Sequence, residues 1–340
     1  MIKIPSFLPS FRNFNPVRFF SHAISFETVS QLSKRWNCVE TSLRSKGYAL
    51  LQGPNSKIGT LGQVASLFGT AQKHLRNHQT GITDIIDESC QNKKTQVASN
   101  GEFLPHTDGT YLNGMIRSKE GKYFRVGPPK FILLQCIQPA SDGGGTNILV
   151  DGEMILHSMI EKEPELLSSV FSPISIMRGD HLVLDVPIFK TLPSGFYALR
   201  FSYDSDMYFP KKMGVQLARF NERYISNSEY MTLKHLKEGE ILVIDNLRSL
   251  HARTAFVGER HLRRLWIHDD TESEEFINPQ GDLYYKSDIP ATSPTAKYET
   301  YGPVSDPSLS AKSIQAGIYI PPHLKRVLDF HVLRKGIEPI

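Results

Sequence analysis

Apolar residues recur at helical spacing near the start of the chain, from Phe26 to Lys46, and the pattern ends at Gly47. Apolar side chains three or four positions apart share one face of a helix, and glycine commonly ends one. We therefore expect a helix over this segment, a strand at Tyr48–Gln52 and a second short helix at Thr60–Phe68.

Farther along, short runs rich in β-branched and aromatic residues are separated by turn-forming residues. Such runs are typical of strands. The expected strands are Gly81–Asp87, Phe131–Gln138, Thr146–Val150, Ile174–Arg178, Leu182–Phe189, Phe196–Tyr203, Ile241–Asp245 and Leu262–Ile267. Two helical patterns interrupt them: one begins after the N-cap Asp151 and runs through Leu166, and the other runs from Val215 to Leu236.

Many short strands with few helices favour a β-sandwich or jelly-roll barrel over the regular alternation of a doubly wound fold. After Trp266 the sequence becomes acidic, and then rich in Pro, Ser, Thr and Tyr. We expect one main domain over residues 26–270. Residues 1–25 form an N-terminal extension, and residues 271–340 form a partly irregular C-terminal extension that packs on the same domain.

The composition excludes several classes of protein. The chain has 340 residues, of which 40% are apolar and 22% charged, as in ordinary globular proteins. Its net charge of +4 includes no long run of like charge, so we expect neither a nucleic-acid partner nor a membrane partner. The 3 cysteines are far apart, which argues against a disulfide scaffold or a structural zinc site. A homo-oligomer remains compatible with this composition.

The first acidic residue is Glu27, and the basic residues before it give the N-terminal segment some likeness to an organelle transit peptide. Pro5, Pro9 and Pro16 would interrupt the amphipathic helix that such a peptide forms. We therefore expect a cytoplasmic protein, with organelle targeting as the alternative.

The segment Pro105-His106-Thr107-Asp108-Gly109 contains a histidine and an aspartate two residues apart. On an extended chain these side chains point to the same side and can reach one metal ion. The spacing suits the facial triad of two histidines and one carboxylate, which binds iron(II) and leaves three coordination positions open. Alone, an H-x-D pair is weak evidence, because most such pairs are structural.

A candidate for the third ligand is His251, which follows an apolar strand and a turn. The next strand is apolar but carries Arg260, Arg263 and Arg264. Buried guanidinium groups need an anionic partner, so arginines on an inward face suggest a carboxylate ligand. Strand alternation puts Arg260 and Arg264 on one face and Arg263 on the other, which we expect to face outward.

Taken together, the motifs resemble the taurine dioxygenase and TfdA-like superfamily of iron(II)/2-oxoglutarate-dependent oxygenases. The matching segments are Pro105–Gly109, Gly143–Asn147 with Asp151–Gly152, Asp245–Asn246 through His251–Arg253, and Arg260–Leu262. They keep the family's order and cover roughly residues 80 to 268. The resemblance implies an α+β fold with a double-stranded β-helix (jelly-roll) core and flanking helices.

The resemblance also implies roles for individual residues. His106, Asp108 and His251 would ligate Fe(2+), while Thr146 and Arg260 would hold the distal carboxylate of 2-oxoglutarate. Arg264 matches a second family arginine near the cosubstrate or an anionic substrate group. The implied reaction consumes O2 and 2-oxoglutarate, releases succinate and CO2, and hydroxylates a small substrate, with an anionic or zwitterionic, amino-acid-like molecule as the candidate.

Two alternatives remain open from the sequence. A jelly-roll of this kind could bind a small molecule without turnover, or hold zinc on the same three ligands and act as a hydrolase. Oxygen dependence separates an oxygenase from a hydrolase. Desaturation, ring closure and epimerisation are compatible with the same iron site, and the sequence does not name the substrate.

Overall fold

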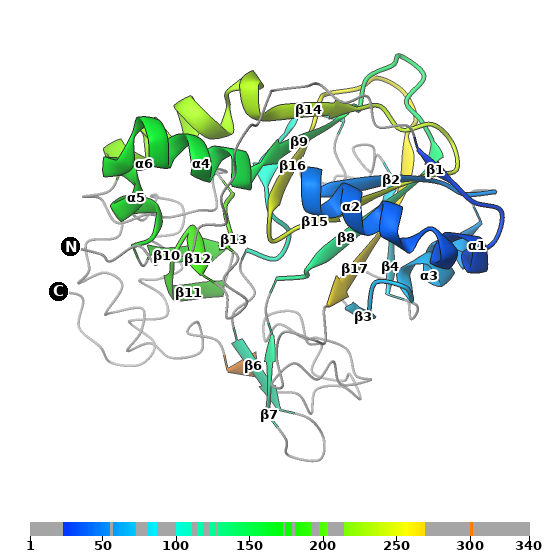
Figure 1. The fold of residues 1–340 in the computed structure, drawn as a ribbon, viewed down its shortest axis with the longest axis horizontal. Helices are drawn as coiled ribbons and strands as arrows, with labels where there is room; N and C mark the ends of the chain where they lie inside the picture. The colour runs from blue at the N-terminus through cyan, green and yellow to red at the C-terminus, as the bar shows by residue number, and fades with distance from the viewer. Residues whose placement is uncertain are drawn as a thin grey trace.

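The computed structural model describes residues 23–54, 57–72, 81–86, 100–110, 114–117, 123–126, 128–172, 174–178, 181–191, 197–202, 214–268 and 300–301. Within these residues, two principal sheets and two groups of helices form layers (Figure 1). The expected mixture of helices and antiparallel sheets is confirmed. Apart from residues 23–25 and 300–301, the predicted extensions lie outside the described residues.

The larger sheet has 7 strands, and all its pairs are antiparallel except the pair at its β1 edge. In spatial order they are β1 (Ile24–Ser25), β2 (Tyr48–Gln52), β15 (Glu240–Asp245), β8 (Phe131–Gln138), β17 (His261–His268) and β3 (Thr70–Gln72), with β4 (Ile82–Ile86) also paired to β17. Strands far apart in the sequence are therefore neighbours in this sheet.

The smaller principal sheet has 4 strands in the order β14 (Met231–Lys234), β9 (Asn147–Asp151), β16 (Ser249–Arg253) and β5 (Phe103–His106). Short pairings complete the described strands: β6 (Gly114–Arg117) with β7 (Tyr123–Val126) and β18 (Thr300–Tyr301), β10 (Ile174–Arg178) with β11 (His181–Val186), and β12 (Phe189–Thr191) with β13 (Tyr197–Leu199).

Helices cover the outer face of each principal sheet (Figure 1). The larger sheet is covered by α1 (Val29–Lys34), α2 (Trp36–Lys46) and α3 (Ile58–Ala65), and the smaller one by α4 (Gly152–Lys162), α5 (Pro164–Val170) and α6 (Gly214–Phe220). Between the sheets lies a third apolar cluster, which joins residues of β2, β8, β15 and β17 to Leu149 of β9.

Strand alternation decides which side chains of the smaller sheet point inward. Val150 and Leu250 belong to the cluster under α4–α6, whereas their neighbour Leu149 belongs to the cluster between the sheets. His251 is the cross-strand partner of Leu149, and directly paired residues share a face. The imidazole of His251 therefore points into the space between the two sheets.

Two predicted helix ends are confirmed. Gly47, in the left-handed conformation with φ 74°, ends α2, and its N–H donates to the Leu43 carbonyl at 2.8 Å. Asp151 caps α4 by accepting a hydrogen bond from the Glu153 N–H at 3.0 Å.

Three predicted helices are divided or shorter. The first is split at Arg35 into α1 and α2. The helix predicted from Asp151 through Leu166 breaks at Glu163, because the following Pro164 disfavours helical geometry in the residue before it. The prediction of a helix from Val215 to Leu236 was wrong beyond Tyr230. Helix α6 passes into a π-helical segment, η4 (Asn221–Ile225), and a 3-10 turn, η5 (Ser228–Tyr230), which precede strand β14.

The error at residues 231–234 has its cause in tertiary structure. Residues 231–234 pair with β9, and the hydrogen bonds of that ladder outweigh the helical spacing of their apolar side chains. Within the described residues, no helix has the length and apolar character that crossing a membrane requires.

Candidate metal centre

His106 and His251 lie on adjacent strands of the smaller sheet. His106 ends β5, His251 is in the middle of β16, and the two are direct cross-strand partners. Their ring centroids are 4.2 Å apart. Sheet pairing therefore joins two histidines that are far apart in the sequence, as the predicted triad requires.

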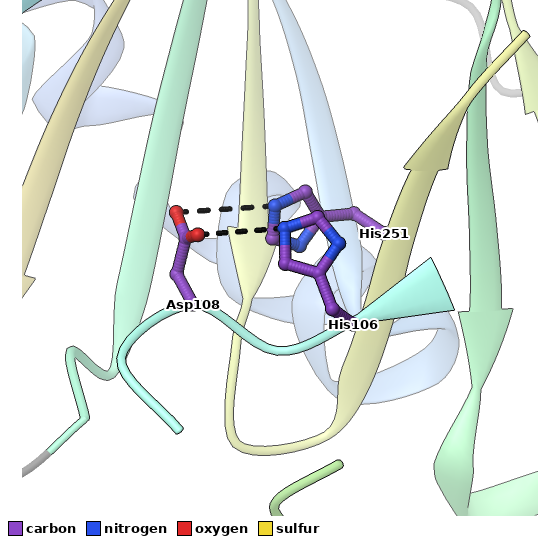
Figure 2. Close-up of side chains that lie close together, drawn as sticks. All are labelled: His106, Asp108 and His251. Atoms are coloured by element: carbon purple, nitrogen blue, oxygen red, sulfur yellow. Dashed lines mark ion pairs between the residues drawn. The ribbon is translucent and has the colours of Figure 1, made fainter. Parts of the chain in front are cut away.

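Asp108 follows β5 in a turn, two residues after His106. The linking residue Thr107 is fixed by the neighbouring segment: its N–H donates to the Phe201 carbonyl at 2.8 Å, and its hydroxyl accepts from the Phe201 N–H at 3.1 Å. The chain therefore holds the Asp108 carboxylate facing both imidazoles, as Figure 2 shows.

The three side chains form a buried cluster with the dimensions of a metal site. Their candidate ligand atoms all lie within 4.8 Å of one another. The Asp108 carboxylate lies 3.5 Å from His106 Nε2 and 3.9 Å from His251 Nε2. His106, Asp108 and His251 expose only 3%, 6% and 8% of their surface. Two imidazoles and one carboxylate that converge on one point form a donor set that a divalent metal ion would bind.

The hydrogen bonding of His106 suits a metal ligand. Its Nδ1 lies 2.8 Å from the Leu104 carbonyl, which only accepts hydrogen bonds, so Nδ1 carries the proton. The opposite nitrogen, Nε2, is buried, and it has no hydrogen-bond partner among the described residues. This arrangement fixes the tautomer that leaves the Nε2 lone pair available for a metal ion.

The protonation states of the other two residues also suit a metal ligand. Burial, followed by His106, lowers the pKa of His251 to about 3; Asp108 opposes this shift, and Arg264 adds a smaller lowering. For Asp108, burial raises the pKa, but Arg264 and the two histidines lower it to well below its usual range. At neutral pH the cluster therefore offers a neutral imidazole and a carboxylate.

Asp108 is held at both its backbone and its carboxylate. The Asn246 side chain accepts from the Asp108 N–H at 2.7 Å and donates to the Asp108 carbonyl at 3.0 Å. At the carboxylate, Trp266 Nε1 donates to Oδ2 at 2.6 Å, and Arg264 lies 3.0 Å from the same oxygen. Neither Asn246 nor Trp266 had a predicted role, although the two-residue alternation of β17 (His261–His268) puts Trp266 on the same face as Arg264.

Arg264 was predicted near the cosubstrate or a substrate anion. It lies at the candidate metal centre, where its guanidinium forms an ion pair with Asp108. Arg263 points away from this face, as predicted, and its Nε donates to Asp84 Oδ1 at 3.2 Å.

The glycine run that precedes Thr146 packs closely on Arg260; these two are the predicted cosubstrate residues. The Thr146 N–H donates to Thr254 Oγ1 at 3.0 Å, which holds the run against the segment after β16. A Cβ added to Gly145 would lie 2.7 Å from Cδ and Nε of Arg260. This close approach explains the glycine next to Thr146.

Arg260 is a buried cation. It exposes 6% of its surface, and burial followed by the charge of Arg253 lowers its pKa to about 10. The guanidinium carbons of Arg253 and Arg260 lie 5.1 and 5.5 Å from the Phe256 ring centroid. No carboxylate of the described residues forms an ion pair with Arg260, so the site suits an anionic ligand.

Residues 12–266 match the model of the family described as "Taurine catabolism dioxygenase TauD, TfdA family". The chain belongs to this family. The predicted resemblance and the predicted enzyme class, a 2-oxoglutarate-dependent dioxygenase, are thereby confirmed.

Solved structures share the fold of this TauD-family chain at low sequence identity. The PvcB protein from Pseudomonas aeruginosa has 18% identity over 78% of this chain and 96% of its own, with a TM-score of 0.54. Asparagine oxygenase, in complex with Fe(II), hydroxyasparagine and succinate, has 13% identity over 70% and 79% of the two chains, with a TM-score of 0.52. The oxygenase OrfP, in complex with Fe and alpha-ketoglutaric acid, has 13% identity over 70% and 80%, with a TM-score of 0.52.

Proposed function

We propose that this TauD-family protein is an Fe(II)- and 2-oxoglutarate-dependent dioxygenase that hydroxylates a small, amino-acid-like substrate. The observation that carries the proposal is the buried cluster of His106, Asp108 and His251, whose ligand atoms lie within 4.8 Å of one another. Two imidazoles and one carboxylate form the donor set of a facial triad, which leaves three positions on the metal for other ligands.

The fold that supports this site is, in our proposal, a double-stranded β-helix. Its two principal sheets enclose one apolar cluster, and the three proposed ligands come from the smaller sheet and the turn after its edge strand. We assign residues 26–270 to this oxygenase domain, preceded by an extension at 1–25 and followed by one at 271–340. A rigid sheet suits a metal centre, because it fixes two of the three ligands by strand register.

For the cosubstrate, we propose that Thr146 and Arg260 bind the distal carboxylate of 2-oxoglutarate. A guanidinium binds a carboxylate through two parallel hydrogen bonds, and a hydroxyl can add a third. The desolvated state of Arg260 strengthens that pairing, since charges attract more strongly where water is excluded.

When bound, iron and 2-oxoglutarate together supply the oxidising chemistry: O2 is consumed, 2-oxoglutarate is converted to succinate and CO2, and a substrate C–H bond is hydroxylated. The protein's part is to orient its ligands and exclude water. His106, with its proton on Nδ1 at the Leu104 carbonyl, keeps Nε2 free to bind the metal. Asp108 accepts a hydrogen bond from Trp266 and is paired with Arg264, whose charge lowers the pKa of Asp108.

The proposed substrate class rests on the structural neighbours. One of them is an asparagine oxygenase, and a structure of OrfP contains (3S)-hydroxy-L-Arg. An amino-acid-like substrate carries a carboxylate, and the cationic Arg264 beside the metal ligands is a suitable partner for it.

The first test uses protein purified without oxygen and mixed with Fe(II) and 2-oxoglutarate. The chelate should produce a weak visible metal-to-ligand charge-transfer band, which His106→Ala should abolish. Free amino acids are then screened for oxygen-dependent succinate release and for a product with one added oxygen atom. No band in the unmodified protein would overturn the proposal. Binding of 2-oxoglutarate without turnover of any substrate would instead favour a non-catalytic binding protein.

A further inference from the structure

Trp266 donates the shortest hydrogen bond at the metal centre: its Nε1 lies 2.6 Å from Oδ2 of Asp108. We propose that Trp266 is a positioning residue that determines which oxygen of Asp108 faces the metal ion. This inference rests on the proposed function, because it assigns a role toward the metal of that same site.

The two oxygens of Asp108 have different surroundings. Oδ2 accepts hydrogen bonds from Trp266 and, at 3.0 Å, from Arg264. Oδ1 has the longer Arg264 contact at 3.3 Å. Each oxygen faces one imidazole: Oδ1 lies 3.5 Å from His106 Nε2, and Oδ2 lies 3.9 Å from His251 Nε2. The difference between them is in the donors, because the lone pairs of Oδ2 are directed at Trp266 and Arg264, which leaves Oδ1 as the better metal ligand.

One consequence concerns the number of coordination positions. If Asp108 bound through both oxygens, the triad would occupy four of six octahedral positions and leave two. Binding through Oδ1 alone leaves three, which 2-oxoglutarate and O2 require together. By engaging Oδ2, Trp266 therefore preserves the open position on which an oxygenase depends.

Trp266 is suited to this task by chemistry and by packing. An indole N–H only donates, so it favours the ionised carboxylate and cannot exchange roles with it. The side chain exposes 4% of its surface and belongs to the apolar cluster between the sheets. The Arg264 guanidinium carbon lies 5.0 Å from its ring centroid, which joins the two donors into one unit. Partners of metal ligands, when removed, typically cost about 10–100-fold in metal affinity.

The sequence contains a matched control, since it has only 2 tryptophans. Trp36 is half-buried on α2 and makes an edge contact with Phe68, with ring centroids 4.9 Å apart. Full-length protein and its Trp36→Phe and Trp266→Phe variants are titrated with cobalt(II) under anaerobic conditions, and the visible d–d spectrum is recorded. Each variant is checked for folding by circular dichroism.

We expect Trp266→Phe to bind cobalt about 10–100-fold more weakly and with a changed d–d spectrum at saturation, while Trp36→Phe matches the unmodified protein. Equal affinity and an unchanged spectrum in Trp266→Phe would overturn the inference but leave the proposed function intact. Failure of the unmodified protein to bind cobalt would overturn the proposed function, and the inference with it.

A second measurement does not depend on the folding of Trp266→Phe. In zinc-loaded, 15N-labelled protein, two indole N–H resonances are expected, and Trp36→Phe assigns them. The Trp266 resonance should be shifted downfield and protected from exchange with water, because its proton is held by a carboxylate. Exchange as fast as that of Trp36 would show that the hydrogen bond is absent from the metal-bound protein and would overturn the inference.

Discussion

The side chain of Asn246 is hydrogen-bonded to both the N–H and the carbonyl of Asp108, 138 residues earlier in the chain. The same amide donates to the Pro129 carbonyl at 2.8 Å, and Asn246 is fully buried. A carboxamide with one acceptor and two donors satisfies all three backbone groups, so the turn that carries Asp108, the proposed metal ligand, is fixed to the end of β15.

The first prediction concerns these three hydrogen bonds of Asn246. Asn246→Ala leaves three buried backbone groups without their partner, which should lower the free energy of unfolding by about 3 kcal/mol. Because Asp108 loses its anchor, metal affinity should fall by about tenfold or more. Urea unfolding and cobalt titration measure the two effects.

Asn227→Ala is the matched control, because Asn227 also bonds backbone groups but does so on the surface, at the cap of η5. It should cost about 1 kcal/mol and leave metal affinity unchanged. Equal effects of both variants on metal affinity would contradict a specific role for Asn246.

A second prediction separates Arg260, which directly precedes β17, from Arg263 within that strand. Arg260→Ala should weaken 2-oxoglutarate binding by about 100-fold or more, since a buried guanidinium–carboxylate pair loses one partner. Arg260→Lys should recover part of this loss, because it keeps the charge without the planar fork. The charge-transfer band, titrated with 2-oxoglutarate, gives the affinity.

Arg263→Ala provides the control, because the Arg263 side chain is paired with Asp84 on the opposite face of β17. It should leave 2-oxoglutarate affinity unchanged. Metal affinity should be unaltered in Arg260→Ala. If Arg263→Ala lost as much 2-oxoglutarate affinity as Arg260→Ala, the cosubstrate would bind elsewhere.

A third prediction uses two glycines with the same backbone geometry. Gly143 and Gly145 have φ of 75° and 65°, so alanine strains both by about 1–2 kcal/mol. Only at Gly145 does the added Cβ meet Arg260, at 2.7 Å, whereas at Gly143 no atom lies within 4 Å. Gly145→Ala should therefore weaken 2-oxoglutarate binding by about tenfold or more, through displacement of Arg260.

Gly143→Ala should reproduce the loss of stability without the loss of affinity. Thermal unfolding and titration of the charge-transfer band distinguish the two quantities. If both variants bound 2-oxoglutarate as tightly as the unmodified protein, the close packing of Gly145 on Arg260 would not be needed for 2-oxoglutarate binding.

The residues brought together at the metal centre were predictable where the signal is local. His106 and Asp108 are two residues apart, and β17 alternates so that Arg264 and Trp266 share a face. The contacts that hold Asp108 were not predictable, because Asn246 and Trp266 lie 138 and 158 residues away from it. Those contacts depend on how β5, β15 and β17 come together in three dimensions, and hydrophobic pattern alone does not encode that arrangement.

The errors in the predicted elements have a related cause. Periodicity detects an apolar face but does not say whether a short apolar run pairs with a distant strand. Residues 231–234 have helical neighbours in sequence, yet they form the edge strand beside β9. Strand β5 was missed because its four residues include Pro105, which weakens a strand signal except at a sheet edge, and β5 is the edge strand.

The last prediction concerns pH. Burial, opposed by Lys130 and Arg248, raises the pKa of Asp245 from 3.8 to about 6. Between these values the folded protein binds more protons at this site than the unfolded chain, so the contribution of Asp245 to stability is full below pH 3.8 and is lost as pH rises through about 6. Relative to Asp245→Asn, which keeps an acceptor for the Leu247 N–H, the unmodified protein should lose about 1 kcal/mol of unfolding free energy between pH 5 and 7. Urea unfolding across that range measures the difference, and parallel stability curves for the two proteins would show that Asp245 ionises normally in the folded state.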